Sequence, residues 1–513
     1  MNGAQRAFEA AHRAGVEVCF ANPGTTEMEM VAALDSVTGI RSVLCLFEGV
    51  ATGAADGYGR MAEKPALTLV HLGPGFANGI ANLHNARRAG TPIVNLIGDH
   101  PTWHLSSDSP LTSDIESLAS PVSKWVRRSD SAGKLVQDTV EAIAVAQSEP
   151  SGVASLIVSQ NAAWDDAPDG LPTVSTPSIV LDEKALQSAA RLLKEKGERG
   201  ALLLGSRALR PSLEAAARIQ SATGCQVFLD TFMARLEGGA GLPTFDVIPY
   251  FPEQAIERLS GLQAMVVAGS RPPVAFFGYK HLNRSALLPD ECETQVVCGL
   301  GVDSGPCLTA MAQELGAQAY GGSESAERPA EPDGELNPMS LGLALVSVLP
   351  EGAIVVNESA TSSLGWVVHS PNAAPHDVLN LTGGAIGQGI PCSVGAAIAA
   401  PDRPVVALQA DGSGMYTVQG LWTMAREQLN ITVLVCANRA YRILQTELQR
   451  SGNHDPGPAA MSMTSLSSPE LDWTKLAAGM GLPAVRVTRA DELVVALKRS
   501  LAEPGPSLIE ALL

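Results

Sequence analysis

Short apolar runs typical of strands alternate with helical stretches along the whole chain. The N-terminal residues favour an amphipathic helix that enters a strand, and the later runs are ALTLVHL, TPIVNLIGD, ASLIVSQ, ALLLGS, AMVVAGS, TQVVCGL, AIVVNES, VVALQAD, ITVLVCAN and PSLIEALL. Repeated strand, helix and strand units favour parallel sheets that are covered by helices. The sequence therefore predicts an α/β fold of doubly wound parallel sheets.

Two segments interrupt this alternation. Residues 164–180 and 321–338 are rich in Pro, Gly, Ser and acidic residues, which is typical of linkers. The chain has 513 residues, which is too long for a single hydrophobic core. We therefore predict three α/β units of similar size, at residues 1–168, 180–325 and 336–513.

The composition excludes several classes of protein. No stretch reaches the roughly 18 uninterrupted apolar residues that a membrane span needs, and the N-terminal residues lack a signal-peptide pattern, so we expect a cytoplasmic protein. The formal net charge of -18 repels phosphate backbones, so nucleic acid is not an expected partner. The eight cysteines form no CxxC pair and the nine histidines no HExxH motif, which argues against a disulfide framework and a zinc site.

Polar residues stand at the ends of several predicted strands, where parallel sheets bind their ligands. These residues are Glu48, His71, Asp99, Asn357, Asp411 and Asn438. Glu48 raises a particular question, because it follows the run RSVLCLF (41–47), which is typical of a buried strand, and precedes a helix rich in Gly and Ala. A carboxylate in such a place needs a partner.

Segment 405–441 carries the strongest local signal. Its pattern is strand, loop, helix, strand and turn, with Asp411 at the end of the first strand and Asn438 at the end of the second. Between them, GSG (412–414) leaves backbone N–H groups free at a helix start, which favours a phosphate oxygen. A carboxylate, an amide oxygen and phosphate oxygens together suit Mg2+ holding a diphosphate. Alternatively, Asp411 is a helix N-cap and Asn438 a turn residue.

The same segment resembles the cofactor motif of thiamine diphosphate-dependent enzymes, in which Gly-Asp-Gly is followed further on by Asn-Asn. This chain has Ala410 before Asp411 and Ala437 before Asn438, so alanine replaces one glycine and one asparagine while both side-chain ligands are kept. The family's third metal ligand is a backbone carbonyl, which falls at Ala440. The resemblance implies thiamine diphosphate and Mg2+, with Gly412 and Ser413 at the phosphates.

The resemblance extends over the whole chain. CFANPGTTE (19–27), LTLVHLGPGFANGIANLHNARRAGTPIVNLIGD (67–99), VNESATS (356–362) and LTGGAIGQGIPCSVGAAIAAPDRP (381–404) occur in the order seen in acetolactate synthases and benzoylformate decarboxylases. Among these enzymes, the chain resembles acetolactate synthase large-subunit homologues in particular. The resemblance implies that the three units are a pyrimidine-binding, a central and a diphosphate-binding domain. It also implies a homodimer or homotetramer with the active site between subunits.

The family also gives Glu48 a role. A glutamate hydrogen-bonded to the pyrimidine ring of the cofactor makes the ring's amino group basic enough to deprotonate the thiazolium carbon. Glu48 matches that residue, and Phe47 and Val50 provide apolar surroundings. In the family, the following helix lies in a subunit interface and the glutamate reaches the partner chain's cofactor. Alternatively, Glu48 forms a salt bridge with an arginine or starts a helix.

Further cofactor contacts follow from the matching motifs. Ile386, in GGAIGQG, matches a bulky residue that holds the two cofactor rings in a bent conformation, although a core isoleucine in a Gly-rich turn would give the same pattern. Ala360 lacks the hydroxyl that the family has near the diphosphate. The remaining implied contacts are Asn78, Ser359, Thr361 and Gly384. FAD is not expected, because no feature of the chain requires it.

Two residues are implied on the substrate side. His71 matches an active-site histidine of benzoylformate decarboxylase, although a lone histidine after a strand is equally typical of a core residue. Thr25 matches a serine that binds the substrate carboxylate there, and threonine keeps the hydroxyl. A 2-oxo acid is therefore the expected substrate.

Other positions depart from the family pattern. The second catalytic histidine of that decarboxylase falls at Phe277 or Gly278, with Lys280 and His281 displaced from it. This departure argues against simple decarboxylase chemistry. The loop after another strand adds Asp99, His100, His104 and Asp108, which either line the site or belong to a solvated loop.

We therefore expect a thiamine diphosphate- and Mg2+-dependent enzyme that cleaves or forms a C–C bond on a 2-oxo acid. It would be either an acetolactate synthase-like carboligase or a decarboxylase. The alternative is a homologue that binds the cofactor without catalysis and has a regulatory or binding role. Retention of Glu48, Ile386, Asp411 and Asn438 argues against this alternative, and the altered substrate histidine argues for it.

Overall fold

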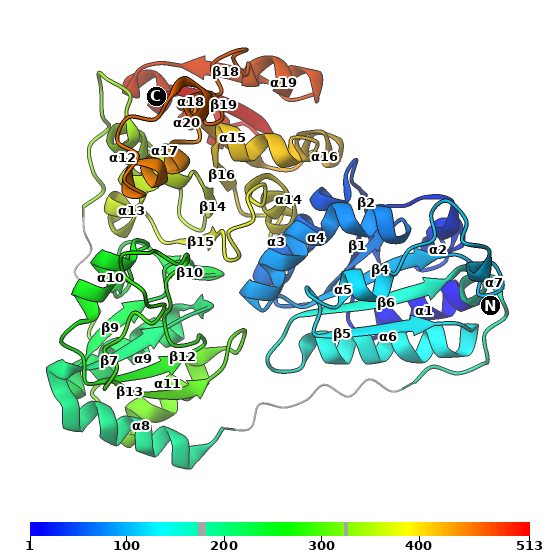
Figure 1. Cartoon of the computed structure of the whole chain (residues 1–513), viewed down its shortest axis with the longest axis horizontal. Coiled ribbons are helices and arrows are strands. Elements are labelled where there is room, and N and C mark those ends of the chain that lie inside the picture. Colours follow the sequence, from blue (N-terminus) through cyan, green and yellow to red (C-terminus); the bar gives the residue numbers. More distant parts are fainter. Residues whose placement is uncertain (173–180, 323–326) are drawn as a thin grey trace.

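The computed structural model describes residues 1–172, 181–322 and 327–513, which form three sheets with helices on their faces (Figure 1). Each apolar run named above contains a strand, and the N-terminal residues form α1 (Gly3–Arg13) leading into β1 (Val18–Asn22). The α/β prediction is thus confirmed. The parts of the predicted linkers at 173–180 and 323–326 lie outside the described residues.

The first sheet has six parallel strands in the order β2-β1-β3-β4-β6-β5. The strands after β1 are β2 (Arg41–Leu44), β3 (Ala66–Val70), β4 (Ile93–Asp99), β5 (Trp125–Ser129) and β6 (Val153–Ser159). One face is covered by α3 (Glu48–Ala62) and α4 (Leu72–Ala89), and the other by α1 and α6 (Ala132–Gln147). Shorter helices are α2 (Met28–Leu34), α5 (Ile115–Ala119) and α7 (Gln160–Trp164).

The second sheet has five parallel strands in the order β11-β9-β7-β12-β13. They are β7 (Gly200–Leu204), β9 (Gln226–Leu229), β11 (Asp246–Val247), β12 (Ala264–Ala268) and β13 (Glu293–Cys298). Its helices are α8 (Glu183–Lys196), α9 (Arg210–Thr223), α10 (Pro252–Leu259) and α11 (Ser304–Glu314). Separate hydrophobic cores lie on its two faces.

The third sheet has eight strands in the order β18-β19-β17-β16-β14-β15-β10-β8. Six are parallel strands from the C-terminal part of the chain: β14 (Ile354–Glu358), β15 (His376–Asn380), β16 (Val405–Ala410), β17 (Ile431–Ala437), β18 (Ala484–Val487) and β19 (Ser507–Leu512). The other two, β8 (Arg207–Ala208) and β10 (Arg235–Gly238), come from the middle of the chain, and β10 runs antiparallel to β15. The expectation of purely parallel sheets in separate units is therefore wrong at this edge.

The helices of the C-terminal part surround the third sheet (Figure 1). They are α12 (Pro338–Val348), α13 (Leu364–His369), α14 (Gly389–Ala399), α15 (Asp411–Gly414), α16 (Gly420–Glu427), α17 (Arg442–Arg450), α18 (Pro458–Ser462), α19 (Trp473–Gly479) and α20 (Ala490–Ala502). α14 covers the face turned toward the first sheet, and α12 and α20 cover the opposite face.

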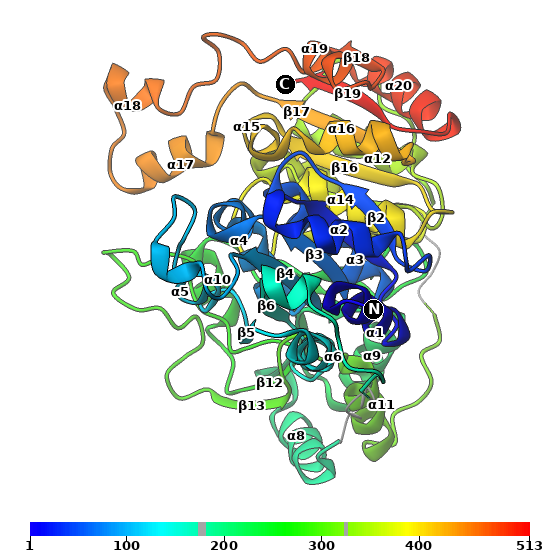
Figure 2. The same cartoon turned by 90° about the vertical axis from the view of Figure 1, so that its right-hand side faces the viewer.

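α3 lies between the first and the third sheets and packs against α14 (Figure 2). It is buried from Glu48 to Met61. A Cβ atom on Gly57 would overlap the carbonyl oxygen of Cys392, so this glycine allows the two helices to approach closely. The partner helix in this contact belongs to the same chain, and the expected subunit contact of α3 stays a prediction.

The strand before Glu48 is shorter and less buried than predicted. β2 is an edge strand that ends at Leu44, and Arg41 and Ser42 are exposed. The Cys45 N–H still donates to the Ala21 carbonyl at 2.8 Å, and the chain then bends at residues 46 and 47 before α3 begins at Glu48.

Two further observations concern the chain as a whole. No helix in the described ranges is long and apolar enough to cross a lipid bilayer. Seven cysteines are buried free thiols and Cys292 is half-buried, as expected for cysteines in apolar runs.

Candidate active site

Glu48 is the first residue of α3 and lies beyond the carboxyl end of the first sheet. It is 6% exposed, and the side-chain amide of Asn78 on α4 donates a hydrogen bond to its Oε2 at 3.0 Å. Within residues 1–172, 181–322 and 327–513, no arginine or lysine forms an ion pair with it, so the salt-bridge alternative does not apply. The carboxyl group is buried beside a neutral amide, which leaves it free to share a proton with a ligand.

His71 follows β3 directly and faces a second buried carboxylate. Its Nδ1 lies 2.8 Å from Oε2 of Glu27, which is fully buried. Glu27 also accepts hydrogen bonds from the Thr26 hydroxyl at 2.6 Å and from the Gly24 backbone N–H at 2.7 Å. A carboxylate held in this way fixes the orientation of the imidazole and favours a proton on Nδ1.

Sequence reasoning did not single out Glu27, although NPGTTE contains it. The available signal was a carboxylate shortly after β1, on the same sheet edge as His71. Thr25, the predicted substrate ligand, is exposed at the start of the same short 3-10 turn, Thr25–Glu27. The contacts of this turn therefore gather Thr25, Glu27 and His71 in one place.

The third sheet brings the predicted metal ligands together. β16 and β17 are parallel neighbours, so Asp411 and Asn438 follow adjacent strand ends. Asp411 accepts hydrogen bonds from the backbone N–H groups of Gly412 (2.8 Å) and Arg439 (2.7 Å), and Asn438 Oδ1 accepts one from Ala440 N–H at 3.0 Å. Burial raises the pKa of Asp411 above its usual value, and these backbone hydrogen bonds oppose that shift.

The donor set at this turn fits Mg2+. The carbonyls of Arg439 and Tyr441 accept backbone hydrogen bonds from Leu466 and Leu444, whereas none to the Ala440 carbonyl is found among the described residues. A carboxylate, an amide oxygen and a free carbonyl are hard oxygen ligands. In the described part of the chain, no three His, Cys, Asp or Glu side chains meet as a metal site.

The predicted phosphate contacts surround this turn. Ser413 is buried and its hydroxyl accepts a hydrogen bond from Gln409 Nε2 at 2.6 Å. Ser359 is buried and its hydroxyl donates to Asn357 Oδ1 at 2.9 Å. Thr361 lies exposed in the 3-10 turn Ala360–Ser363, beyond the end of β14. Of these three hydroxyls, that of Thr361 is the most accessible to a ligand.

The segment that carries Ile386 is anchored by a buried carboxylate. Glu358, at the end of β14, accepts hydrogen bonds from the backbone N–H groups of Gly387 and Gly389 at 2.6 Å each. Gly384 adopts a φ of 74°, which turns the chain before the half-buried Ile386. Burial raises the pKa of Glu358, although the hydrogen bonds that it accepts oppose the shift.

Glu358 gives rise to a pH-dependent contribution to stability. Because its pKa is raised in the folded state, the folded protein binds more protons than the unfolded one above the usual value of 4.5, and stability falls as pH rises through this window. Glu358→Gln should remove this contribution, which amounts to at most about 1.4 kcal/mol per pH unit. Urea unfolding of the cofactor-free protein across this pH range measures it, and parallel pH profiles of the two proteins would contradict the assignment.

Left-handed backbone conformations adjoin three of the predicted site residues. The non-glycine residues concerned are Leu72 (φ 52°), Ala360 (φ 48°) and Arg439 (φ 56°), which are next to His71, Thr361 and Asn438. Such conformations cost free energy and cluster where a ligand needs groups in fixed places.

Other ionisable groups considered from the sequence make different contacts. Asp99 forms an ion pair with Arg128, and His100 Nε2 lies 3.0 Å from the Ser109 hydroxyl. His281 Nε2 lies 2.6 Å from Glu253 Oε1, while Phe277 is exposed on the same loop. Neither histidine contacts the His71 and Glu27 pair through a hydrogen bond or ion pair in the described residues.

The candidate site consists of two half-sites. The first contains Glu48, Asn78 and His71 at the edge of the first sheet, and the second contains Asp411 and Asn438 at the edge of the third. Among the described residues, no hydrogen bond or ion pair joins these two groups within the chain.

Comparisons with known proteins identify the family of the chain. The family profile for the N-terminal thiamine pyrophosphate-binding domain of thiamine pyrophosphate enzymes matches residues 1–118, and the profile for the C-terminal binding domain matches residues 360–511. The Mycobacterium tuberculosis protein IlvX, which is named after the acetolactate synthase large subunit, is 47% identical over 99% of this chain and 98% of its own length. Benzoylformate decarboxylase of Pseudomonas aeruginosa is 27% identical over 98% and 97%.

The fold is shared with solved structures. The 4-hydroxybenzoylformate decarboxylase of Rhodococcus jostii superposes with a TM-score of 0.84 over 100% of this chain and 99% of its own, at 21% identity. Both half-sites fall within or beside the segments that the two profiles match. The chain belongs to the thiamine diphosphate-dependent enzymes, and each half-site lies within one of the two matched binding domains.

Proposed function

We propose that this enzyme requires Mg2+ as well as thiamine diphosphate and that it cleaves or forms a C–C bond on a 2-oxo acid, as an acetolactate synthase-like carboligase or a decarboxylase. The observation that carries the proposal is the buried Glu48 carboxyl, held by Asn78 at 3.0 Å with no cationic partner among the described residues. A relative named for each activity aligns over nearly the whole chain.

The domain assignment and the cofactor contacts are part of this proposal. Residues 1–168 are the pyrimidine-binding domain, 180–325 the central domain and 336–513 the diphosphate-binding domain. Asp411, Asn438 and the Ala440 carbonyl hold Mg2+, and Gly412, Ser413, Ser359 and Thr361 surround the diphosphate. Gly384 and Ile386 lie against the cofactor rings.

The cofactor, when bound, supplies an electron sink for the carbon that loses CO2. Glu48 holds or shares a proton at the pyrimidine ring, and Asn78 keeps the Glu48 carboxyl in place. Thr25 offers a hydroxyl to the substrate carboxylate. His71, oriented by Glu27, is placed to deliver or remove a proton at the substrate.

We propose that two chains complete each site, in a homodimer or a homotetramer. The two half-sites have no direct polar contact within the described chain, and each is flanked by exposed apolar side chains. Leu46 and Met28 lie beside the first half-site, and Leu364, Tyr416 and Leu444 lie beside the second. Such exposed apolar groups around polar half-sites suit a symmetric subunit contact.

The charge and the cysteines of the protein support a proposed cellular compartment and class of ligand. The eight free cysteines suit a reducing compartment, and we place the protein in the cytoplasm. The net charge of -18 favours small-molecule substrates over nucleic acid.

The decisive experiment screens 2-oxo acids for CO2 release by the purified protein with thiamine diphosphate and Mg2+, with and without a second carbonyl compound as acceptor. Release without an acceptor identifies a decarboxylase, and product formation that needs the acceptor identifies a carboligase. A silent panel with the cofactor bound would favour the non-catalytic homologue, which the absence of a histidine at 277–278 supports.

The His71 and Glu27 pair allows a specific test of the proton-transfer role. Glu27→Gln and His71→Ala should each lower kcat/KM by about 100-fold, the usual scale of general acid–base catalysis, and should leave cofactor binding unchanged. His12→Ala is the matched control, because His12 lies on α1 at the opposite face of the first sheet. Unchanged kinetics in both variants would remove the pair from the mechanism.

A further inference from the structure

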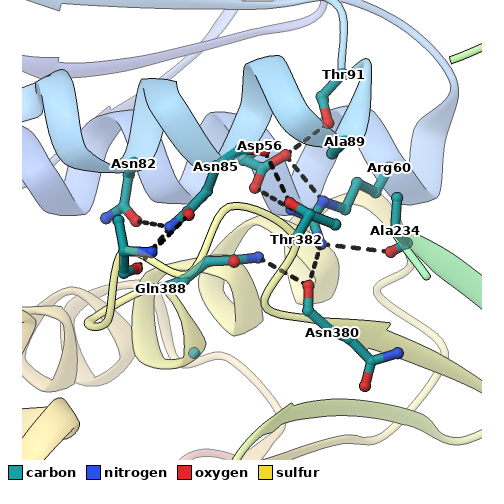
Figure 3. Close-up of polar contacts among 12 residues, drawn as sticks. Asp56, Arg60, Asn82, Asn85, Ala89, Thr91, Ala234, Asn380, Thr382 and Gln388 are labelled. Carbon is teal, nitrogen blue, oxygen red and sulfur yellow. Dashed lines mark hydrogen bonds and ion pairs between the residues drawn. The ribbon is translucent and has the colours of Figure 1, made fainter. Parts of the chain in front are cut away.

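A buried ion pair lies in the second half of α3. Arg60 is 3% exposed, and its Nε and Nη2 donate to the two carboxyl oxygens of Asp56 at 2.9 and 2.5 Å (Figure 3). Thr91 donates from its hydroxyl to Asp56 Oδ1 at 2.6 Å. A buried guanidinium is tolerated only where its remaining N–H groups also find acceptors.

Most of those acceptors lie on the segment that carries Ile386, and a further one is the Ala234 carbonyl, 3.4 Å from Nη1. Arg60 Nη1 donates to the carbonyl of Asn380 at 2.7 Å, and Nη2 donates to the Thr382 hydroxyl at 3.0 Å. In its hydrogen-bonded amide orientation, the side-chain oxygen of Gln388 accepts from Nη1 at 3.0 Å and from Nη2 at 2.9 Å. Arg60, on α3, thus forms hydrogen bonds with residues at both ends of segment 380–388.

α4 holds the middle of the same segment. Asn85 donates to the Ala385 carbonyl at 2.7 Å and accepts from the Ala385 N–H at 3.2 Å, so both backbone groups next to Ile386 are fixed. The Thr382 hydroxyl donates to the Asn85 carbonyl at 2.8 Å. His84 Nε2 lies 3.1 Å from the Gly383 carbonyl. All of these contacts are made within one chain.

We propose that Arg60 and Asn85 are positioning residues that set the place of Ile386 against the cofactor of their own chain. This inference rests on the proposed function, in which Ile386 contacts thiamine diphosphate and Glu48 reaches the cofactor of the partner. α3 then serves two active sites of a dimer at once. Its first residue acts in the partner's site, and Arg60 acts in its own.

Two matched hydroxyl-to-methyl substitutions test the positioning role. Thr382→Val removes the hydroxyl on the cofactor segment, and Thr91→Val removes the hydroxyl on the far side of the same ion pair. Thr382→Val should weaken thiamine diphosphate binding about fivefold, because the apparent affinity scales with the fraction of chains whose segment is in place. It should also change the near-ultraviolet circular dichroism of the bound cofactor, whereas Thr91→Val should change neither.

Wild-type cofactor affinity in Thr382→Val would overturn the proposal, and so would an equal loss in both variants. Asn85→Ala provides a second variant that leaves the ion pair intact and should also weaken binding. If the wild-type protein itself fails to bind thiamine diphosphate, the proposed function fails and the positioning role falls with it.

Mixed dimers separate the two sites served by α3. Arg60→Gln alone should lose most activity. One chain carrying Glu48→Gln and one carrying Arg60→Gln, co-expressed with different tags and purified by both, should regain about half the wild-type activity per dimer, because both defects then fall in one of two equivalent sites. A silent mixed dimer would show that Arg60 acts through Glu48 in the partner's site, and would overturn the proposal.

A second mixed dimer tests, independently of Arg60, whether each active site is shared between two chains. Glu48→Gln paired with Asp411→Asn should also regain about half the activity if each site is shared between chains. Failure of this pair refutes the shared site itself. Success of this pair with failure of the Arg60→Gln pair refutes only the positioning role.

Discussion

Glu48→Gln should lower kcat by about two to four orders of magnitude, the scale of a lost acid–base contribution, while thiamine diphosphate and Mg2+ still bind. Glutamine keeps an oxygen that accepts the hydrogen bond from Asn78, so the local packing is retained. Glutamine cannot share a carboxyl proton with the pyrimidine ring. The amino group of the ring would then be less basic and less able to deprotonate the thiazolium carbon. Steady-state kinetics and calorimetric titration of the cofactor separate the two effects.

Glu29→Gln is the control for this prediction, because Glu29 lies on α2 outside the contacts of the site. It should leave both kcat and the cofactor affinity unchanged. Full activity of Glu48→Gln would remove the assigned role, and loss of cofactor binding in that variant would make Glu48 a binding residue instead.

Asp411→Asn should abolish the stabilisation that thiamine diphosphate and Mg2+ give to the wild-type protein. At a cofactor concentration of about 100 times Kd this stabilisation amounts to about 2.7 kcal/mol. Burial raises the pKa of Asp411, so its charged form is unfavourable in the cofactor-free fold. Asparagine removes the buried charge but loses one of the two backbone hydrogen bonds from Gly412 and Arg439, so its two effects on the stability of the cofactor-free protein oppose each other, while metal affinity should fall about 100-fold or more.

Thermal unfolding with and without the cofactor and Mg2+ measures both parts of this prediction. Asp402→Ala is the control, since Asp402 is an exposed residue in the turn before β16. A variant that the cofactor still stabilises to the wild-type extent would exclude Asp411 as a metal ligand.

The strands and the three sheets were predictable because buried parallel strands need continuous apolar runs, and these were visible in the sequence. The third sheet's outer strands were not, since β8 has two residues and β10 (RLEG) carries two charged ones. They join this sheet through β10, because β15 would otherwise be an unpaired edge strand. This pairing depends on the tertiary structure and not on the local sequence. The burial of α3 within a single chain was not predicted for a similar reason. This burial depends on contacts with α14, which is distant in the sequence.

A family motif led to the prediction of Asp411 and Asn438 as metal ligands, and the structure places both after adjacent strand ends. Glu27 was not singled out, because its significance arises from the 2.8 Å approach to His71, which is distant in sequence. Arg60 was missed for the same reason, since its acceptors lie on segment 380–388. Several contacts of the candidate site join residues that are distant in the sequence, and a single sequence does not reveal such contacts.

The pairing of β10 with β15 limits how this protein can be divided. A fragment that starts at residue 336 would expose the backbone N–H and C=O groups of β15 along an uncovered edge. Such an edge recruits strands from other molecules, so this fragment should aggregate unless residues 207–238 accompany it. The enzyme is thus a single unit for expression, even though its chain passes through three sheets.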